Sequence, residues 1–291
     1  MIRRFILSAI SLLLSIIAPA QAPARLAVRM DDMGAFHSVN RAIMDVYADG
    51  ISQSVEIMPV GQWYPEAVRM LAEAPGIDVG VHLAITSEWE NAKWRPLTHC
   101  PSLVDSMGYF RPMMKPNAAY PGLSVKEAGY DIGEVEREFR AQIERARKDV
   151  PSLSHLSDHM GSAAAFPEID SLIHVLAHEY NLPFIDAPDK KSMGFSRVNY
   201  MSPDGNKGPH GTLAEKEESF INMLRSLRPG HNYMFLEHPA YDDSEMSPIF
   251  HIGNENVGAD RQGVTDLLKS PRVRRALRDC NVQLIRISEL F

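Results

Sequence analysis

The sequence predicts an α/β fold: one domain built around a barrel-like (β/α) sheet of seven parallel strands, with long loops at its C-terminal face. Short apolar runs alternate with amphipathic stretches along most of the 291 residues, and 45% of the residues are hydrophobic. Such alternation is typical of parallel strands joined by crossover helices. The roughly 270 residues after the N-terminal segment suit a single barrel-like domain. An open doubly wound sheet is the alternative, but no G-x-G-x-x-G follows the first strand.

The first 22 residues differ in composition from the rest. Arg3 and Arg4 precede an almost unbroken apolar run from 5 to 17, and Ala20-Gln21-Ala22 has the small-x-small pattern of a cleavage site. The run is too short to span a bilayer, which takes about 20 apolar residues. We therefore expect a signal peptide at 1–22, a mature domain at 23–291, no stable membrane anchor after cleavage, and export to the periplasm or the extracellular space.

The expected elements follow in order along the mature chain. Strands are predicted at 26–30, 51–57, 77–83, 153–158, 183–186, 233–237 and 282–287. Helices are predicted at 39–48, 65–74, 132–148, 167–180, 213–227 and 263–279. In the third helix Val135, Phe139, Ile143 and Ala146 fall on one face, the spacing of a half-buried helix. Long connections at 84–130, 201–212 and 238–261 follow predicted strands, which favours functional loops.

Charge and cysteine content limit the classes of partner. Lys and Arg total 30 against 37 Asp and Glu, giving a formal net charge of −7 without any basic block. A nucleic-acid groove or an anionic-membrane surface is therefore disfavoured, because both need clustered cations. Cys100 and Cys280 are compatible with a disulfide or with two free thiols. A monomer and a homo-oligomer both remain open.

Acidic and imidazole side chains stand where four predicted strands end. Asp31 and Asp32 follow the first strand, His82 ends the third, His159 follows the fourth and His238 follows the sixth. In α/β folds these carboxyl ends meet at one face, where sites are built. One carboxylate with two imidazoles is a common metal site that leaves a position for water. The pattern therefore favours a metal-dependent hydrolytic site.

Several ordered motifs resemble the YdjC-like carbohydrate deacetylases, also called the ChbG/HpnK family. The motifs are Met30-Asp31-Asp32-Met33-Gly34, Gly50-Ile51-Ser52-Gln53-Ser54, Asp78-Val79-Gly80-Val81-His82-Leu83, Glu138-x-x-x-Gln142-Ile143, His155-x-x-Asp158-His159-Met160 and His238-Pro239. The similarity runs from about residue 27 to the C-terminus. The resemblance is specific, because the motifs share their order and spacing as well as their residues.

The resemblance implies a polysaccharide-deacetylase-like barrel that removes acetyl groups from N-acetylated sugars, chitooligosaccharides being the best-known substrates. Carried over motif by motif, Asp32, His82 and His159 would hold the metal. Asp31 would be the general base, and His238 would be the general acid or an oxyanion partner. These roles match what amide hydrolysis needs: an activated water, a base, and a proton for the leaving amine.

The cofactor and the substrate contacts are less closely defined. We expect one divalent metal ion, with Zn²⁺ favoured by the mixed ligand set and Mg²⁺, Mn²⁺, Co²⁺ and Ni²⁺ left open. Arg261 resembles an arginine found beyond the His-Pro motif and is a candidate to bind substrate or to orient a carboxylate. Trp89 and Trp94 lie in the long loop after His82, where an aromatic face suits the apolar face of a sugar ring.

The sequence also departs from the family pattern. Arg29 replaces an Asn or similar small polar residue, and Gly161 and Ala163 stand where the family has further histidines. Two alternatives are therefore kept: a barrel that binds a glycan without cleaving it, and a metal-dependent hydrolase of another amide or of a phosphate ester. The first makes little use of a base beside a metal ligand, and the second requires cations at the mouth of the site.

Overall fold

The computed structural model describes residues 22–186, 194–201 and 211–291, which form seven strands and nine α-helices. The strands are β1 (Ala24–Met33), β2 (Ser54–Ile57), β3 (Asp78–Leu83), β4 (Leu153–Asp158), β5 (Ser196–Arg197), β6 (Asn232–Glu237) and β7 (Val282–Ile285). The helices are α1 (His37–Asp49), α2 (Tyr64–Ala72), α3 (Val125–Ala128), α4 (Ile132–Asp149), α5 (Ser162–Ala165), α6 (Pro167–Tyr180), α7 (Leu213–Ser226), α8 (Val257–Lys269) and α9 (Pro271–Asp279). The expected signal peptide lies, apart from Ala22, outside the described residues.

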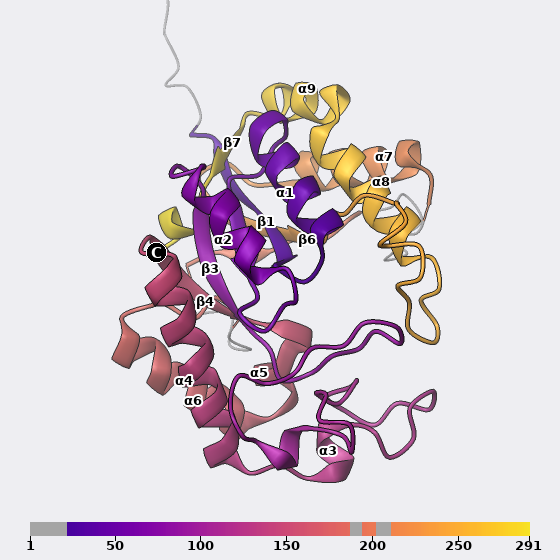
Figure 1. Cartoon of the computed structure of the whole chain (residues 1–291). Coiled ribbons are helices and arrows are strands. Elements are labelled where there is room, and N and C mark those ends of the chain that lie inside the picture. Colours follow the sequence, from indigo (N-terminus) through magenta and orange to yellow (C-terminus); the bar gives the residue numbers. More distant parts are fainter. Residues whose placement is uncertain (1–21, 187–193, 202–210) are drawn as a thin grey trace, which may run out of the picture.

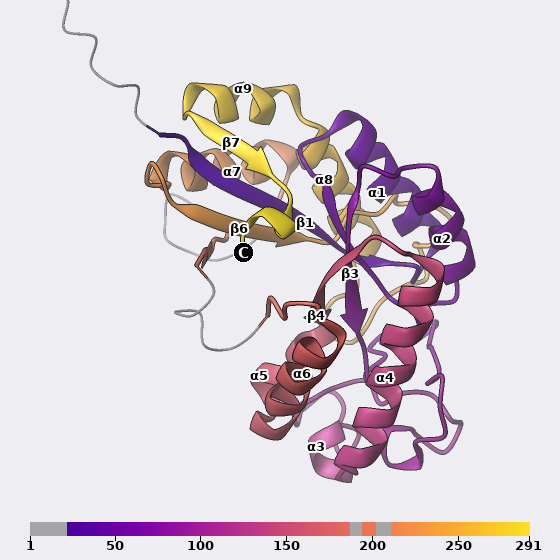
Figure 2. The same ribbon diagram turned by 90° about the vertical axis from the view of Figure 1, so that its left-hand side faces the viewer.

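All the strands are parallel and belong to one curved sheet, which confirms the predicted barrel-like α/β fold. The strand order is β4-β3-β2-β1-β6-β5, and β7 pairs with the first half of β1. Helices follow one another around the sheet, with α1 against α2 and α8, α4 against α6, and α7 against α8 and α9 (Figure 1). Figure 2 shows β7 beside the start of β1, on the side where the C-terminus lies.

Two predicted elements differ from the structure. The segment 183–186 contributes only a single bridge, between Phe184 and Leu156, and is not a strand. The predicted helix at 263–279 is two helices, α8 and α9, separated at Ser270. Pro271 has no N–H and keeps the residue before it out of helical conformation. Ser270 is accordingly extended, at φ −62° and ψ 126°, and its side chain caps α9 by accepting from the backbone N–H of Arg272 and Val273.

Alternate residues of the inner strands face two different environments. On β1, Leu26, Val28 and Met30 belong to the large apolar core that also includes the buried faces of the helices. Ala27, between them, belongs to a smaller apolar cluster formed with residues of β6, β7 and the C-terminal segment. Because side chains alternate along a strand, Arg29 and Asp31 share the face of Ala27. The face opposite the helices thus changes from apolar to charged toward the carboxyl end of β1.

Buried carboxylates and amides from distant segments hold the long loops in place. Gln142 on α4 exchanges hydrogen bonds with the backbone N–H and C=O of Ala84, just after β3. Glu138, one turn earlier, accepts from the backbone N–H of Leu97 and Thr98. These contacts give the Glu138-x-x-x-Gln142 motif a structural role, which is to fasten the loop that follows His82.

The loop after β6 is held in a similar way at the start of α1. Glu245 accepts from the backbone N–H groups of His37 and Ser38, at 3.2 and 2.7 Å. These N–H groups have no partner within the helix, so a carboxylate at the helix N-terminus satisfies them and interacts favourably with its dipole.

Within the described ranges, no helix combines the length and apolar character needed to cross a membrane.

Candidate active site

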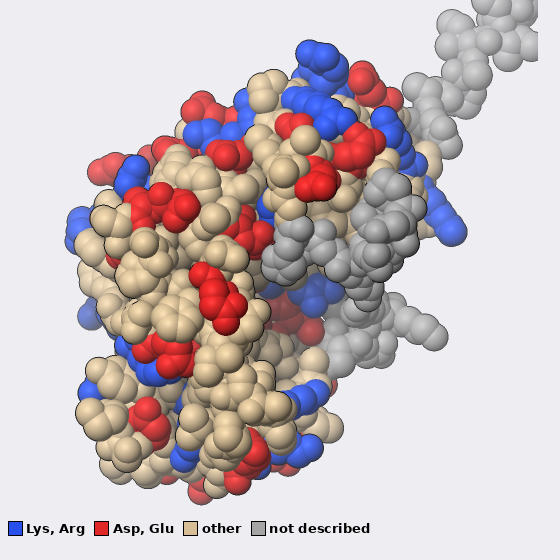
Figure 3. Space-filling view, turned by 90° about the vertical axis from the view of Figure 1, so that its right-hand side faces the viewer, with Lys and Arg blue, Asp and Glu red and all other residues tan. Residues whose placement is uncertain are grey.

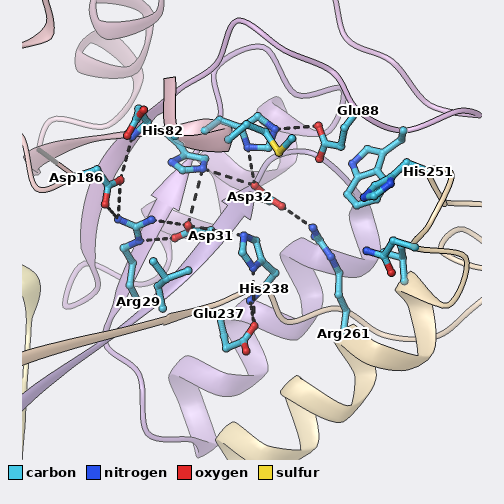
Figure 4. Close-up of a pocket in the computed structure, with 18 of the residues that line it drawn as sticks. Arg29, Asp31, Asp32, His82, Glu88, Asp186, Glu237, His238, His251 and Arg261 are labelled. Carbon is cyan, nitrogen blue, oxygen red and sulfur yellow. Dashed lines mark hydrogen bonds and ion pairs between the residues drawn. The ribbon is translucent and has the colours of Figure 1, made fainter. Parts of the chain in front are cut away.

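A cavity of about 390 Å³ opens where the strands β1, β3, β4 and β6 end. Asp31 and Asp32 reach it from β1, His82 from β3, His159 from the turn after β4, and His238 from the residue after β6. Figure 3 shows the molecule hollowed on this side, with acidic and basic side chains next to each other in the hollow. Figure 4 shows the side chains of Asp31, Asp32, His82 and His238 converging on the centre of the pocket. The structure therefore brings the sequence-predicted ligands, base and acid together.

The end of β1 is irregular at the two acidic residues. The pairing of β1 with β2 shifts register between Met30 and Met33, and Asp32 has φ +71°. A non-glycine residue in this region costs on the order of 1 kcal/mol or more and persists where the surroundings impose it, often at functional sites. The shift turns two consecutive carboxylates, which would point to opposite faces of a regular strand, toward one pocket.

Asp32, His82 and His159 have the arrangement of a metal site. One potential ligand atom from each lies within 4.8 Å of the others, and all three side chains are buried. Asp32 Oδ1 is 3.4 Å from His159 Nδ1 and 3.8 Å from His82 Nε2, and it accepts no hydrogen bond from any described residue. A buried carboxylate oxygen rarely lacks a partner. An orphaned carboxylate oxygen facing two imidazole nitrogens fits a divalent cation.

The outer nitrogen of each imidazole is held by a neighbouring side chain. His159 Nε2 donates to Glu88 Oε2 at 3.0 Å, and His82 Nδ1 lies 2.8 Å from Ser157 Oγ. In metal sites such partners fix the ring orientation and decide which nitrogen is free to bind the ion. In both histidines the remaining nitrogen faces Asp32, as Figure 4 shows for His82.

The electrostatics around the cluster favour a positive charge at its centre. Burial lowers the pKa of His159, but Glu88 and Asp32 outweigh it and raise the pKa to about 10. Burial also lowers the pKa of His82, which ends below its ordinary value although Asp31 opposes the shift. Burial raises the pKa of Asp32, yet Arg261 and His159 bring it well below the usual range. In the metal-free protein the cluster thus holds an ionised Asp32, a neutral His82 and a His159 that is protonated at neutral pH. A cation bound there would take the place of the His159 proton.

Arg29 binds the second carboxylate, Asp31, through two hydrogen bonds. Its Nε and Nη2 donate to the two oxygens of Asp31, each at 2.6 Å, while Nη1 donates to both oxygens of Asp186 at 2.9 Å. Burial raises the pKa of Asp31, but Arg29 and the nearby His82 lower it below its ordinary value. Arg29, the departure noted in the sequence, is 2% exposed and fixes Asp31 in place.

His238 stands at the rim of the pocket, on the other side of Asp31. Its side chain is 35% exposed, and its Nε2 lies 3.9 Å from Asp31 Oδ2. Burial of the ring lowers its pKa, but Glu237, Asp32 and Asp31 together raise it above the ordinary value of a histidine. His238 is thus both accessible and more readily protonated than a free imidazole.

The three predicted substrate residues occupy different positions. Arg261 donates from Nη2 to Asp32 Oδ2 at 2.8 Å, while its buried Nη1 has no hydrogen-bond partner in the described part of the chain. Trp89 lines the pocket, stacked with His251 and lying under the Arg261 guanidinium. Trp94 is 2% exposed and lies outside the pocket, edge-on to His159, with its indole N–H donating to the Thr86 carbonyl. Stacking of a sugar on Trp94 is therefore not supported.

Sequence reasoning missed several residues that support the site. Glu88 and Ser157 hold the metal-site histidines, and Asp186 shares Arg29 with Asp31. The sequence does contain a signal for Asp186, because it is an acidic residue at the end of a predicted strand, as Asp31 and Asp32 are at the end of the first. Glu88 carried none, since it lies in an irregular loop whose path no local pattern describes.

Sequence comparisons with known proteins point to one family. A sequence model of the family described as YdjC-like protein matches residues 25–279. Carbohydrate deacetylase 2 of Listeria innocua is 28% identical over 263 residues, covering 90% of this chain and 96% of the relative. A carbohydrate deacetylase of Thermus thermophilus is 30% identical over 260 residues, covering 86% and 88% of the two chains.

A solved structure supports the fold. The crystal structure of an Enterococcus faecalis protein named for cellobiose-phosphate cleavage superposes with a TM-score of 0.72. The two sequences are 19% identical, and the match covers 92% of this chain and 99% of the other. At this level of identity the comparison concerns the arrangement of strands and helices alone.

Arg29→Met is expected to destabilise the fold, because it leaves the buried Asp31 without its arginine and Asp186 with Arg197 alone. Removing one partner of a buried ion pair typically costs about 3–5 kcal/mol. Arg197→Met is the matched control, since Arg197 also binds Asp186 but is about a third exposed, and exposed pairs contribute about 1 kcal/mol or less. Urea unfolding of both variants measures the difference. Equal midpoints for Arg29→Met and the unsubstituted protein would contradict the assigned role of Arg29.

Proposed function

Because the chain belongs to the YdjC-like family, we propose that it is a metal-dependent carbohydrate deacetylase, a hydrolase that removes acetyl groups from N-acetylated sugars or oligosaccharides. The two relatives described above are named carbohydrate deacetylases and align over most of their length. The observation that carries the proposal is the orphaned, buried Asp32 Oδ1, which faces one nitrogen of His82 and one of His159.

Asp32, His82 and His159 would hold the ion. The chemistry that a divalent metal supplies when bound at such a site is activation of a water molecule and polarisation of the acetyl carbonyl. Zn²⁺ suits the carboxylate and imidazole donors, and Mg²⁺ is the main alternative. Arg261 fixes the orientation of Asp32 through Oδ2, which leaves Oδ1 turned toward the two imidazoles.

Asp31 is the proposed general base. Its Oδ2 faces the pocket, 3.9 Å from both His82 Nε2 and His238 Nε2, beside the proposed metal position. A base must be ionised before it accepts a proton, and the lowered pKa of Asp31 keeps it so at neutral pH. Arg29 also fixes the direction in which Asp31 points, so the carboxylate needs little reorganisation to take the proton from water.

His238 is the proposed general acid. An amide nitrogen is a poor leaving group until it is protonated, and an imidazolium at the rim can supply the proton. The raised pKa of His238 keeps a larger fraction of the ring protonated near neutral pH. The free Nη1 of Arg261 remains available to donate a hydrogen bond to an oxygen of the substrate, and Trp89 forms part of the wall.

The pocket gives less support to the two alternative functions, hydrolysis of a phosphate ester or another amide and glycan binding without cleavage. A phosphate ester needs uncommitted cations, but Arg29 and Arg197 bind Asp186, and Arg29 also binds Asp31. Arg261 is engaged with Asp32 through Nη2 as well, so its Nη1 offers a single donor rather than an uncommitted cation. A barrel that only binds glycans has no use for the ionised Asp31 beside the Asp32 cluster. N-acetylated sugars, which are uncharged at the acetyl group, fit the remaining polar lining better.

Acetate release from a panel of N-acetylated sugars and short oligosaccharides tests this function. We expect the metal-reconstituted mature protein to release acetate, and Asp31→Asn to lose about 10²–10⁴-fold in kcat while retaining the metal, because the amide cannot accept the proton. Asp32→Ala, His82→Ala and His159→Ala should instead lose the metal itself, measured by elemental analysis, with the fold retained. Full activity in Asp31→Asn would exclude it as the base, and full metal occupancy in the alanine variants would exclude the ligand set.

The role of His238 as general acid predicts how kcat/KM depends on pH. His238 acts in its protonated form, so kcat/KM should fall as pH rises through the pKa of this residue. Glu237→Gln removes the side chain that contributes most to raising that pKa, and should move the alkaline limb to lower pH. Glu66→Gln serves as control, because Glu66 binds His37 outside the pocket and should leave the profile unchanged. An alkaline limb unaffected by Glu237→Gln would argue against His238 as the acid.

We also propose that the protein is exported and acts in the periplasm or outside the cell. The proposal depends on the charged, apolar and small-residue segments of 1–22. N-terminal sequencing of protein recovered from periplasmic and culture fractions should give a chain beginning at Pro23. Full-length protein confined to the cytoplasm would contradict export.

A further inference from the structure

Two residues of the family-like motifs, Gly80 and His155, lie beneath the pocket and do not line it. Glu56 on β2, His155 on β4 and Ser157, also on β4, are all fully buried. They occupy the same side of the sheet as His82, because alternate residues of a strand share a face. Ser157 pairs with His82 itself, whereas Glu56 and His155 lie level with Gly80, two residues before His82 on β3. Ser157 contacts His82, but the roles proposed so far give Glu56 and His155 no function.

Gly80 allows side chains of the two flanking strands to meet. In the sheet register Glu56 pairs with Gly80, and Gly80 pairs with His155. His155 Nε2 is 2.6 Å from Glu56 Oε1, so this contact spans β3 above the glycine. A Cβ atom at position 80 would lie 2.3 Å from both Glu56 Oε2 and His155 Nε2. Only a residue without a side chain leaves room for this pair.

The second oxygen of Glu56 leads to the metal site. Ser157 Oγ donates a short hydrogen bond to Glu56 Oε2, and the same Oγ lies 2.8 Å from His82 Nδ1. A serine hydroxyl has one proton and can accept through its lone pairs. Since that proton is directed at the carboxylate, Ser157 must accept the hydrogen bond from His82, which therefore carries its proton on Nδ1.

We propose that Glu56 is a positioning residue that acts through the Ser157 hydroxyl to set the tautomer of His82. The proton on Nδ1 leaves the Nε2 lone pair free on the side that faces Asp32 Oδ1. The two imidazoles of the cluster are thereby oriented by carboxylates in different ways. Glu88 binds His159 directly, whereas Glu56 reaches His82 through one hydroxyl.

Burial makes this network effective. Hydrogen bonds in a low-dielectric interior are strong and polarise one another, and an unsatisfied member is costly. Glu56 is compensated by His155 and by Arg29, whose Nε lies 4.0 Å away. Because the same Arg29 holds Asp31, the network beneath His82 and the proposed base share one cation.

The inference rests on the proposed function in one respect, the use of His82 Nε2 as a metal ligand. It is tested first on the metal-free protein, by ¹⁵N NMR of the histidine rings at an alkaline pH where His82 is neutral. We expect the Nδ1–H tautomer of His82 in the unsubstituted protein and a mixture of tautomers in Ser157→Ala. Glu56→Gln provides a second test should Ser157→Ala not fold. Ser154→Ala is the control, because it removes a β4 hydroxyl that contacts His155 and not His82.

Zn²⁺ affinity, measured by competition with a chromophoric chelator, provides the second readout. Loss of such a supporting contact typically weakens metal binding about 10–100-fold. We expect a loss in this range for Ser157→Ala, a smaller loss for Glu56→Gln, and unchanged affinity for Ser154→Ala. An Nε2–H tautomer of His82 in the unsubstituted protein, or equal losses in Ser157→Ala and Ser154→Ala, would overturn the proposal. If the unsubstituted protein binds no Zn²⁺, the proposed metal site is in doubt, while the tautomer measurement still decides this inference.

Discussion

The buried guanidinium of Arg29 is the constraint on which the rest of the site depends. It forms two hydrogen bonds with Asp31 and two with Asp186, and its Nε lies 4.0 Å from Glu56. Carboxylates this close and this deeply buried are tolerated only when they are paired and hydrogen-bonded. One residue on β1 therefore sets the position of the proposed base, of the strand end that carries it, and of the polar layer beneath His82.

Side chains alternate between the two faces of each strand, so the same strands contribute to both the apolar core and the site. On β3, Val79 and Val81 join the apolar core, while Gly80 and His82 take part in the polar side of the sheet. This alternation continues to the carboxyl end, where the irregularity at Asp32 interrupts it and brings a second consecutive acid into the pocket. The apolar side holds the sheet rigid, and rigidity is what a site needs to keep its ligands at fixed distances.

The loops complete a site that the strand ends begin. Glu138 and Gln142 fasten the segment after β3, and Glu245 fastens the segment after β6 to the start of α1. Glu88 and Trp89 enter the pocket on the first of these loops. Each anchor is a side chain bonded to backbone, buried for Glu138 and Gln142 and partly buried for Glu245, so the loops are held by interactions comparable to those of secondary structure.

The sequence by itself determined the α/β class, most strands and helices, and the strand-end residues that meet in the pocket, because periodicity and strand-end chemistry are local properties. Tertiary structure alone decided the role of Arg29, the partners of His82 and His159, and the position of Trp94 outside the pocket. Arg29 and Asp186, for instance, are 157 positions apart. Contacts over such separations depend on how the sheet curves and how loops are anchored, and no local pattern records either.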